Sequence, residues 1–438
     1  MNTSEKYALA NQVMEHALKS GARQVFVRIY ERRSSNIELR DQQIDTLKES
    51  NQLGLSVDLY VDKKYSSHST NRLKKTELFK FIDEAIIATR YLAEDEFRQL
   101  PDPELYYKGT ETDLGVFDAS IDTVEAKSKI DMAMEVLNEA YKKDDRIISV
   151  TSGYNDVIAN DVMVASNGFK GDTKNTNVSL FASVSLLTDT GRPSDYWYET
   201  SLHMDKLNKK DIGKKALERT IKKVNPKKIS SGKYTVIVEN RQTGNIFGRV
   251  AQALMGSSLY QKQSFLAGKI DQVVASPILT VYDDPLIPSG PASRLFDDEG
   301  IAAVRRPIIE KGVLRNYYID NYYGRKLGMK PTSGGSTNVL FELGTKNLEQ
   351  MVASVKKGVL ITGFNGGNCN GSTGDFSYGI EGFLIENGKL VHPVNEMNIT
   401  GNMLQLLTSI VELGNDVLPG EANQIPSIML KDADLSGI

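Results

Sequence analysis

The first hundred residues carry two kinds of hydrophobic pattern in turn. Near the start, apolar positions recur every four residues at Leu9, Val13 and Ala17, which predicts an amphipathic helix that stops at Gly21. Short β-branched or aromatic segments separated by polar turns follow, as an antiparallel meander requires: VFVRIYERR, SSNIELRDQQ, GLSVDLYVDKK and YSSHST. A second helical pattern begins near residue 76. This region therefore predicts one α+β unit.

The same order of patterns returns after an aperiodic segment. Residues 97–115 include PDPELYYKGTETDLG, which has proline, glycine and no helical period, so we interpret them as a linker. A helical pattern follows from about 121 to 143, then strand candidates from RIISVTSGYND to YWYETSLH, then a helix from about 211 to 223. The order indicates a helix, meander, helix unit used twice, either by duplication or as two unrelated α+β units.

The second half of the chain is predicted to be rich in strands. The basic stretch KVNPKKISSGK marks a boundary near residue 230. Beyond it, KYTVIVEN predicts a strand, NIFGRVAQALM a short helix, and the rest mostly short strands between glycine-rich turns. We therefore predict an α+β fold with a first α+β unit at residues 1–100, a second at 116–226 and a β-rich C-terminal domain at 231–438.

Composition narrows the class of protein. Hydrophobic residues make up 40% of the chain and charged residues 25%, and 53 Lys plus Arg balance 56 Asp plus Glu. These values are typical of a globular protein, and we expect no direct binding to nucleic acid. The chain has no uninterrupted apolar run of about twenty residues and its start lacks the pattern of a secretory signal, so we expect no membrane span and a cytoplasmic location.

The only cysteine, Cys369, lies in the glycine-rich stretch GFNGGNCNGSTGDFSYG at residues 363–379. A phosphate-binding P-loop also needs a lysine next to its last glycine, and this stretch has none. A nucleophilic cysteine needs a base or a positive field to form the thiolate, and the nearest histidine along the chain, His392, is distant. We favour a packed thiol over a nucleophile.

Histidines and carboxylates offer few local motifs. The four histidines are too far apart along the chain for a local zinc motif: His16, His68, His203 and His392. Acidic residues cluster in TVYDDPL and LFDDEG: Asp283, Asp284, Asp297, Asp298 and Glu299. Such pairs can perform acid and base chemistry when burial separates their pKa values, but Asp beside Pro or Gly more often shapes a turn. We favour turns, with the neighbouring Arg305 and Arg306 balancing the charge.

From about residue 236 onward the chain carries a distinctive ordered series of segments. They are VASPILTVYDD, FDDEG, RRPIIEKGVLRNYYIDNYYGRKLGM, PTSGG, VKKGVLITG, TGDFSYGIEGFLIENGKLVHPV, ITGN and VELGND. The series resembles the TldD/PmbA family, historically labelled modulators of DNA gyrase and understood as a peptidase family. The resemblance covers essentially the whole C-terminal half, and the two preceding α+β units are compatible with it.

The resemblance also indicates which kind of family member this is. TldD-like chains carry HExxxH on the short helix after the KYTVIVEN strand, where two histidines bind zinc, the glutamate is the general base and a late cysteine completes the ligands. Counting back from the VAS segment places Phe247 and Gln252 at the histidine positions and Gly248 at the glutamate. Ile425 is the nearest match to the late cysteine. The chain is therefore similar to the PmbA kind, also called TldE, and we expect no metal or other cofactor in it.

The resemblance implies a noncatalytic subunit of a metallopeptidase. We expect a TldD-like catalytic partner that holds the zinc, a heterodimer with it, a possible homodimer in its absence, and an unfolded peptide substrate that enters a chamber as an extended strand. Glycines permit close approach of a peptide backbone, so Gly366, Gly367 and Gly371 are candidates for the chamber wall.

Two other functions remain open from the sequence. One is a self-sufficient hydrolase that uses Asp283, Asp284, Asp297 or Glu299. The other is an interaction protein that acts on DNA gyrase or its inhibitors, as the historical family label suggests.

Overall fold

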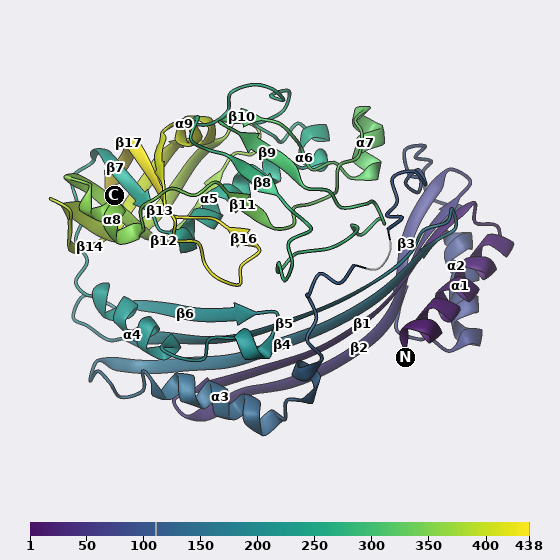
Figure 1. Ribbon diagram of the computed structural model, residues 1–438, viewed down its shortest axis with the longest axis horizontal. Helices are drawn as coiled ribbons and strands as arrows, with labels where there is room; N and C mark the ends of the chain where they lie inside the picture. The colour runs from purple at the N-terminus through teal and green to yellow at the C-terminus, as the bar shows by residue number, and fades with distance from the viewer. Residues whose placement is uncertain (110–111, 438) are drawn as a thin grey trace.

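The computed structural model describes residues 1–109 and 112–437, and it shows a long curved sheet facing a more compact β-rich lobe (Figure 1). The predicted α+β class is confirmed, with 23% helix and 40% strand. The helix predicted at the start runs to Lys19, and Gly21, with φ +109°, follows its C-terminal cap Ser20, as predicted. Its N-terminal cap is Asn2, whose side chain forms a reciprocal capping box with Glu5.

The long sheet has six antiparallel strands in the order β3-β2-β1-β4-β5-β6. Their bounds are β1 Gln24–Arg40, β2 Gln43–Val61, β3 Lys64–Thr70, β4 Ile147–Ala165, β5 Lys170–Leu186 and β6 Ser194–Ser201. The first three strands come from one predicted α+β unit and the last three from the other. The two units therefore share one sheet, in which β1 and β4 pair with Arg33 opposite Ile158.

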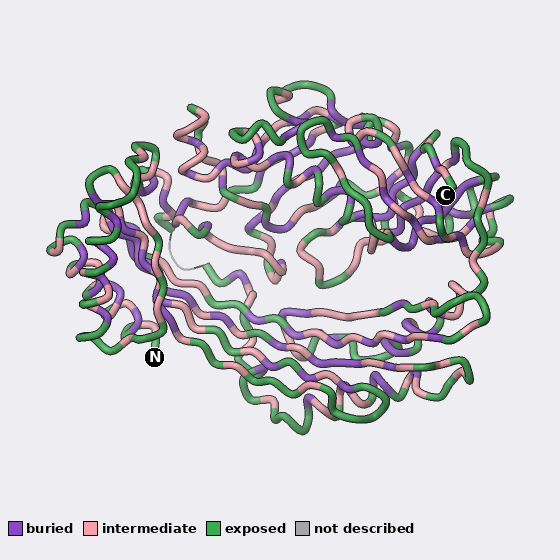
Figure 2. Tube along the Cα trace, turned by 180° about the vertical axis from the view of Figure 1, so that it is seen from behind, coloured by how far each residue is buried: buried purple, intermediate pink, exposed green. Residues whose placement is uncertain are grey.

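The four longest helices of this half cover one face of the sheet, two on each unit. They are α1 Thr3–Lys19, α2 Lys75–Thr89, α3 Ala126–Asn138 and α4 Ile212–Lys222, and two short 3₁₀ helices are η1 Ala119–Thr123 and η2 Met204–Lys206. In β1, Val27 and Ile29 pack under α1 and α2, whereas Ile37 and Leu39 pack under α3 and α4. Figure 2 shows buried and exposed positions alternating along the long strands.

The prediction of separate strands at VFVRIYERR and SSNIELRDQQ was wrong, because both segments belong to β1. The polar run between them looked like a turn, but its side chains are bound by helical residues: Glu31 by Lys6 and Ser35 by Lys129. The turn lies instead at Asp41 and Gln42, which both have positive φ.

The segment interpreted as a linker, residues 97–115, packs between the sheet and the second lobe; residues 110 and 111 lie outside the described part of it. Leu100 and Tyr106 are buried in a cluster with Phe26, Phe169 and Phe296. Prolines and polar residues hide this packing in the sequence, because the buried side chains are isolated and have no period.

The C-terminal lobe contains a five-stranded sheet and a six-stranded sheet within the described residues. The strands are β7 Gly232–Val238, β8 Val281–Asp283, β9 Arg306–Glu310, β10 Val313–Leu314, β11 Val339–Phe341, β12 Lys357–Cys369, β13 Asp375–Glu386, β14 Lys389–Asn402, β15 Ile410–Leu413, β16 Asn423–Gln424 and β17 Ile428–Gly437. The helices are α5 Asn240–Ala253, α6 Gly256–Tyr260, α7 Asn321–Leu327, α8 Leu348–Ala353 and α9 Met403–Thr408. The larger sheet has the order β14-β13-β12-β7-β17-β15, and a further pairing of β14 with β17 closes it on itself.

Polar contacts join the two lobes. Arg219 of α4 donates two hydrogen bonds to the carboxylate of Glu239, of 2.7 and 2.9 Å, and Arg28 of β1 forms an ion pair of 2.7 Å with Asp298. A two-pronged bond from guanidinium to carboxylate fixes orientation as well as distance. In the described part of the chain, no helix is long and apolar enough to cross a membrane.

Candidate functional site

Helix α5 carries the positions that the sequence aligned with the zinc motif. The helix directly follows β7, whose Val236 and Val238 are fully buried and anchor it to the core. Phe247 is 8% exposed, and its ring meets that of Phe341 edge to face, with centroids 4.7 Å apart. Such a pair adds to the free energy of packing. Phe247 is therefore part of the hydrophobic core.

The other two positions on α5 face away from the core. Gly248 and Gln252 are exposed, and a Cβ atom built on Gly248 would meet no atom within 4 Å. Ile425, the match to the late cysteine, is 7% exposed and lies in the same core cluster as Phe247. Phenyl, glycyl and sec-butyl groups offer no donor atom to zinc, and a single exposed amide is a poor ligand. The residues present at these positions do not fit a zinc ion.

Two of the three predicted chamber glycines lie beside α5. Gly366 and Gly367 line a pocket of about 200 Å³ together with Asn245 and Arg249 of the helix. Gly371 does not line this pocket. It lies in the turn after β12, where its carbonyl accepts a hydrogen bond of 2.8 Å from the amide of Phe265. The structure thus brings Gly366 and Gly367 together and separates Gly371 from them.

The second half of β12 has one unpaired edge among the described strands. β12 pairs with β7 only from Gly358 to Ile361, after which β7 turns into α5. From Gly363 to Cys369, β12 pairs with β13 alone, and Asn365 and Gly366 form a bulge in that pairing. An unpaired strand edge presents backbone amides and carbonyls that a further extended chain can bind.

Cys369 ends β12 and is half-buried. Burial raises the pKa of its thiol, with Arg249 nearby opposing the shift. A raised pKa leaves little thiolate at neutral pH, so the thiol is poorly suited to act as a nucleophile. Its Sγ atom lies 3.8 Å from the carbonyl oxygen of Asn370. These observations favour the packed thiol that the sequence predicted.

The acidic clusters hold the backbone in place. Asp284 accepts a hydrogen bond of 3.0 Å from the amide of Leu286, and Asp297 accepts bonds of 3.0 and 2.9 Å from the amides of Glu299 and Ile301. The predicted turns are therefore confirmed at Asp284 and Asp297.

Asp283 differs, because it lies at the end of strand β8 and is fully buried. Its Oδ1 atom accepts bonds of 2.6 and 2.7 Å from the amide and hydroxyl of Thr337. Asp283 and Asp284 lie 3.5 and 3.2 Å from Arg306 and Arg305, so the predicted charge balance is confirmed.

Glu299 has an unusual titration. Burial raises the pKa of its carboxyl to about 8, the charges of Asp297 and Asp320 add to the effect, and a hydrogen bond from the amide of Asn321 opposes it. That bond, of 2.9 Å, fixes Glu299 Oε2 to the start of α7. The carboxyl therefore stays largely protonated at neutral pH.

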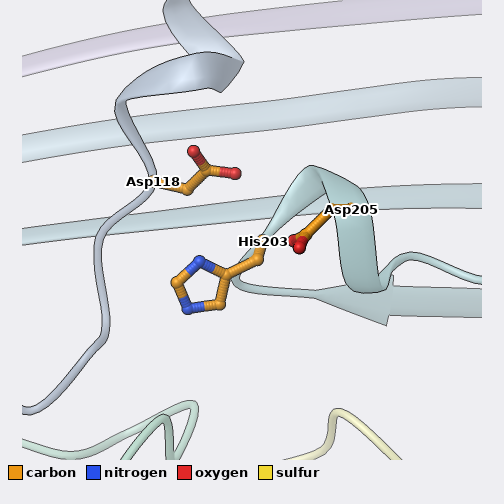
Figure 3. A group of neighbouring side chains, drawn as sticks. All are labelled: Asp118, His203 and Asp205. Atoms are coloured by element: carbon orange, nitrogen blue, oxygen red, sulfur yellow. The ribbon is translucent and has the colours of Figure 1, made fainter.

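Among the described residues, the structure brings together a group of possible metal ligands that the sequence did not predict. The ligand atoms of Asp118, His203 and Asp205 lie within 4.8 Å of one another (Figure 3). His203 Nε2 donates to the carbonyl of Gly115 at 2.8 Å, since a carbonyl only accepts. Asp118, however, accepts amide hydrogen bonds from Ser120 and Met204, which already explain its position. No short-range motif signals this group, because its members come from two distant loops.

Comparisons with known proteins bear on all three parts of the chain. Models of three domains match it: PmbA/TldA metallopeptidase domain 1 at residues 25–89, the central domain at 119–224 and the C-terminal domain at 231–437. The chain belongs to the PmbA/TldD family. Its relatives within the family include the metalloprotease PmbA homolog of Haemophilus influenzae, 28% identical over 429 residues, with 97% of this chain and 94% of the relative covered. The metalloprotease PmbA of Escherichia coli O157:H7 is 28% identical over 406 residues, with 92% and 90% covered.

Solved structures of the PmbA/TldD family extend the comparison. The crystal structure of a proposed modulator of DNA gyrase from Bacteroides thetaiotaomicron is 48% identical, with a TM-score of 0.98 and full coverage of both chains. TldE from Thermococcus kodakarensis is 19% identical, with a TM-score of 0.86 and 98% and 100% covered, which shows a common fold. The TldD homolog of Haemophilus influenzae matches over only 198 residues, 40% of this chain and 41% of the relative, at 28% identity.

Proposed function

We propose that this protein is the noncatalytic PmbA/TldE-like subunit of a cytoplasmic TldD/TldE-type metallopeptidase complex that degrades or processes unfolded peptides. The observation that carries the proposal is the packing of Phe247 against Phe341, because this core side chain stands at the position that we match to a zinc-binding histidine of TldD-like chains. In this proposal the zinc belongs to a TldD-like partner, and the chain holds no cofactor of its own.

The extent of similarity supports the assignment to the PmbA kind. Two PmbA relatives match over 90% or more of their own length, whereas the TldD homologs of Buchnera aphidicola and Haemophilus influenzae match over 66% and 41% of theirs. The contribution of such a subunit is to bind the partner and to position peptide. We therefore expect a heterodimer with the TldD-like chain, and a homodimer can form when that partner is absent.

The unpaired edge of β12 supports a role in holding peptide. An extended peptide that adds to the edge from Gly363 to Cys369 satisfies its backbone groups without using its side chains, so the contact is independent of peptide sequence. Gly366 and Gly367 at the bulge allow close approach of a second backbone. We therefore assign the peptide-holding role to this edge, and Gly371 has no part in it.

The two alternatives have weaker support. A self-sufficient hydrolase would use Asp283, Asp284, Asp297 or Glu299, but each of these carboxyls accepts hydrogen bonds that hold the local backbone. Similar solved structures carry the name of DNA gyrase modulators, and among the described residues of this chain no cluster specifically favours an action on DNA gyrase.

The proposal is tested by expressing the tagged chain together with a TldD-like chain that carries HExxxH. We expect the two to copurify, with hydrolysis of an unfolded protein by the mixture and none by the tagged chain alone. A His to Ala change in the partner's HExxxH should abolish the activity, whereas Glu299→Gln in this chain should not. Zinc-dependent hydrolysis by the tagged chain alone would overturn the proposal.

A further inference from the structure

The pocket between α5 and the bulge of β12 combines features of a site for an anion. It has a volume of about 200 Å³, and its lining includes Arg249, Asn245 and Tyr378 as polar side chains, with Ile246 and Phe364 as the apolar part. Arg249 is the one charged residue in the lining. The pocket is therefore positively charged at neutral pH.

The cation of this pocket has no carboxylate partner in the described chain. Arg249 is exposed, and no Asp or Glu among residues 1–109 and 112–437 lies within 4.0 Å of its guanidinium, in contrast with Arg219, Arg305 and Arg306. A planar guanidinium is the cation best suited to bind a carboxylate with two parallel hydrogen bonds.

A buried hydroxyl adds a donor beside the cation. Tyr378 is 9% exposed, and its Oη atom makes no hydrogen bond of good geometry within the described residues. Burial raises the pKa of the phenol, Cys369 adds to the shift and the neighbouring Arg249 opposes it, so the hydroxyl keeps its proton at neutral pH. A buried donor without a partner is costly in free energy, and an anion in the pocket would satisfy it.

The backbone is shaped to admit the anion. Gly366 and Gly367 have φ of +81° and +111°, and a Cβ atom at Gly366 would meet no atom within 4 Å. The pairing of β12 with β13 skips from Phe364 to Gly367, which leaves the bulge without a partner on β13. The pocket wall at the bulge is therefore free of side chains at these two glycines.

The position of the pocket indicates which molecule supplies the anion. It lies at the bulge in the unpaired half of β12, so a peptide held along that edge places its own groups within reach of Arg249. We propose that this pocket is a subsite for the terminal carboxylate of a peptide, with Arg249 and Tyr378 as its anchoring residues. The inference rests on the proposed peptide-holding function of the β12 edge and adds to it a preference for a free C-terminal end.

The test compares two short peptides of identical neutral sequence with a fluorescent label at the N-terminus, one ending in a free carboxylate and the other in an amide. Binding to the full chain is measured by fluorescence anisotropy. We expect the acid to bind about tenfold more tightly, since a charge-assisted hydrogen bond is worth that much or more. The variants R249Q and Y378F should reduce the preference, and R192Q, which removes an equally exposed cation far along the chain, should retain it.

The outcomes separate this subsite from the broader proposal. Equal binding of acid and amide overturns the subsite and leaves the peptide-holding edge intact. Binding of neither peptide overturns both. A preference that survives R249Q overturns the assignment of Arg249. An amidated peptide with an internal glutamate that binds as tightly as the acid shows that a side-chain carboxylate is the ligand, which contradicts a terminal subsite.

Discussion

Lys6 and Lys129 occupy equivalent positions in the two halves of the six-stranded sheet. Lys6 of α1 lies 2.9 Å from Glu31 of β1 and donates to the carbonyl of Asn160 of β4. Lys129 of α3 lies 2.7 Å from Asp156 of β4 and donates to Ser35 of β1. Because Glu31 pairs with Asn160 and Ser35 with Asp156, the two contacts are related by a pseudo-twofold axis between the central strands.

This relationship favours duplication over two unrelated units. In the strand order β3-β2-β1-β4-β5-β6, corresponding strands of the two units take mirrored places. The first strand of each unit lies at the centre, the second next to it and the third at the edge. Each unit also places a buried lysine near the start of its first helix, where it fixes the helix to both central strands. Two unrelated α+β units would have no reason to repeat so specific a polar contact.

The first prediction concerns the buried ion pairs. Lys129→Met leaves Asp156, which is 4% exposed, without its cation, so we expect a loss of about 3–5 kcal/mol in the free energy of unfolding. Lys127→Met, on the same helix, breaks an exposed ion pair with Asp131 and should leave the free energy of unfolding almost unchanged. Denaturant unfolding measures both, and similar losses in the two variants would contradict the assigned burial.

The second prediction concerns α5. Phe247→Ala removes a core ring and its contact with Phe341, which should cost about 3 kcal/mol or more. Gln252→Ala changes an exposed side chain and should stay within about 0.5 kcal/mol. If these positions bound zinc, a chelator would lower the melting temperature of the parent chain and would have little effect on either variant. Thermal unfolding with and without a chelator therefore tests the structural role, and a chelator effect in the parent chain contradicts it.

The third prediction concerns pH. The pKa of Glu299 is about 8 in the folded chain and near 4.5 in the unfolded chain, so only the unfolded chain releases this proton between the two values. This carboxyl therefore favours folding at low pH, and the contribution is lost as pH rises through that window.

Glu299→Gln removes the titration. Relative to the parent chain, its free energy of unfolding should rise between about pH 5 and pH 8, by up to about 1.4 kcal/mol per unit. Glu104→Gln, at an exposed position, serves as the control. A difference from the parent that stays constant over this range would show that Glu299 ionises normally.

The fourth prediction concerns the bulge of β12. Gly366→Ala places a methyl group on a left-handed residue that faces open space, so the variant should fold with a loss of about 1–2 kcal/mol and bind peptide more weakly. Gly328→Ala, after α7, has a similar positive φ and open surroundings, and it should show the same loss of stability with unchanged peptide binding. Unchanged peptide binding in Gly366→Ala removes the bulge from the peptide-holding site.

Local patterns in the sequence predicted the elements more successfully than their partners. The strand β7 and the helix α5 follow directly from the sequence, because KYTVIVEN is rich in β-branched residues and NIFGRVAQALM has an apolar face. The joining of the two α+β units into one sheet depends on the pairing of Phe26 with Ala165, and nothing in either segment encodes so distant a contact. The polar centre of β1 resembles a turn in the sequence. In the fold it continues the strand, because lysines from two helices stabilise its side chains.

In the candidate site, too, the sequence predicted single residues and the fold revealed their contacts. The resemblance located Phe247, Gly248 and Gln252 on one helix, and the glycines of the β12 bulge stood out by composition. The meeting of Arg249 with Tyr378 depends on how α5 crosses the sheet, so only the fold reveals it. Gly371 shares the composition of its neighbours yet lies outside the pocket, because the strand ends before it.

The most direct test of the central claim is the zinc content of the purified chain. Elemental analysis after exhaustive dialysis, set against the protein concentration, should find almost no zinc in the isolated chain and close to one zinc per heterodimer in the complex with a TldD-like partner. Near-equimolar zinc in the isolated chain would mean that the fold builds a metal site from other residues, and it would contradict the assignment of a noncatalytic subunit.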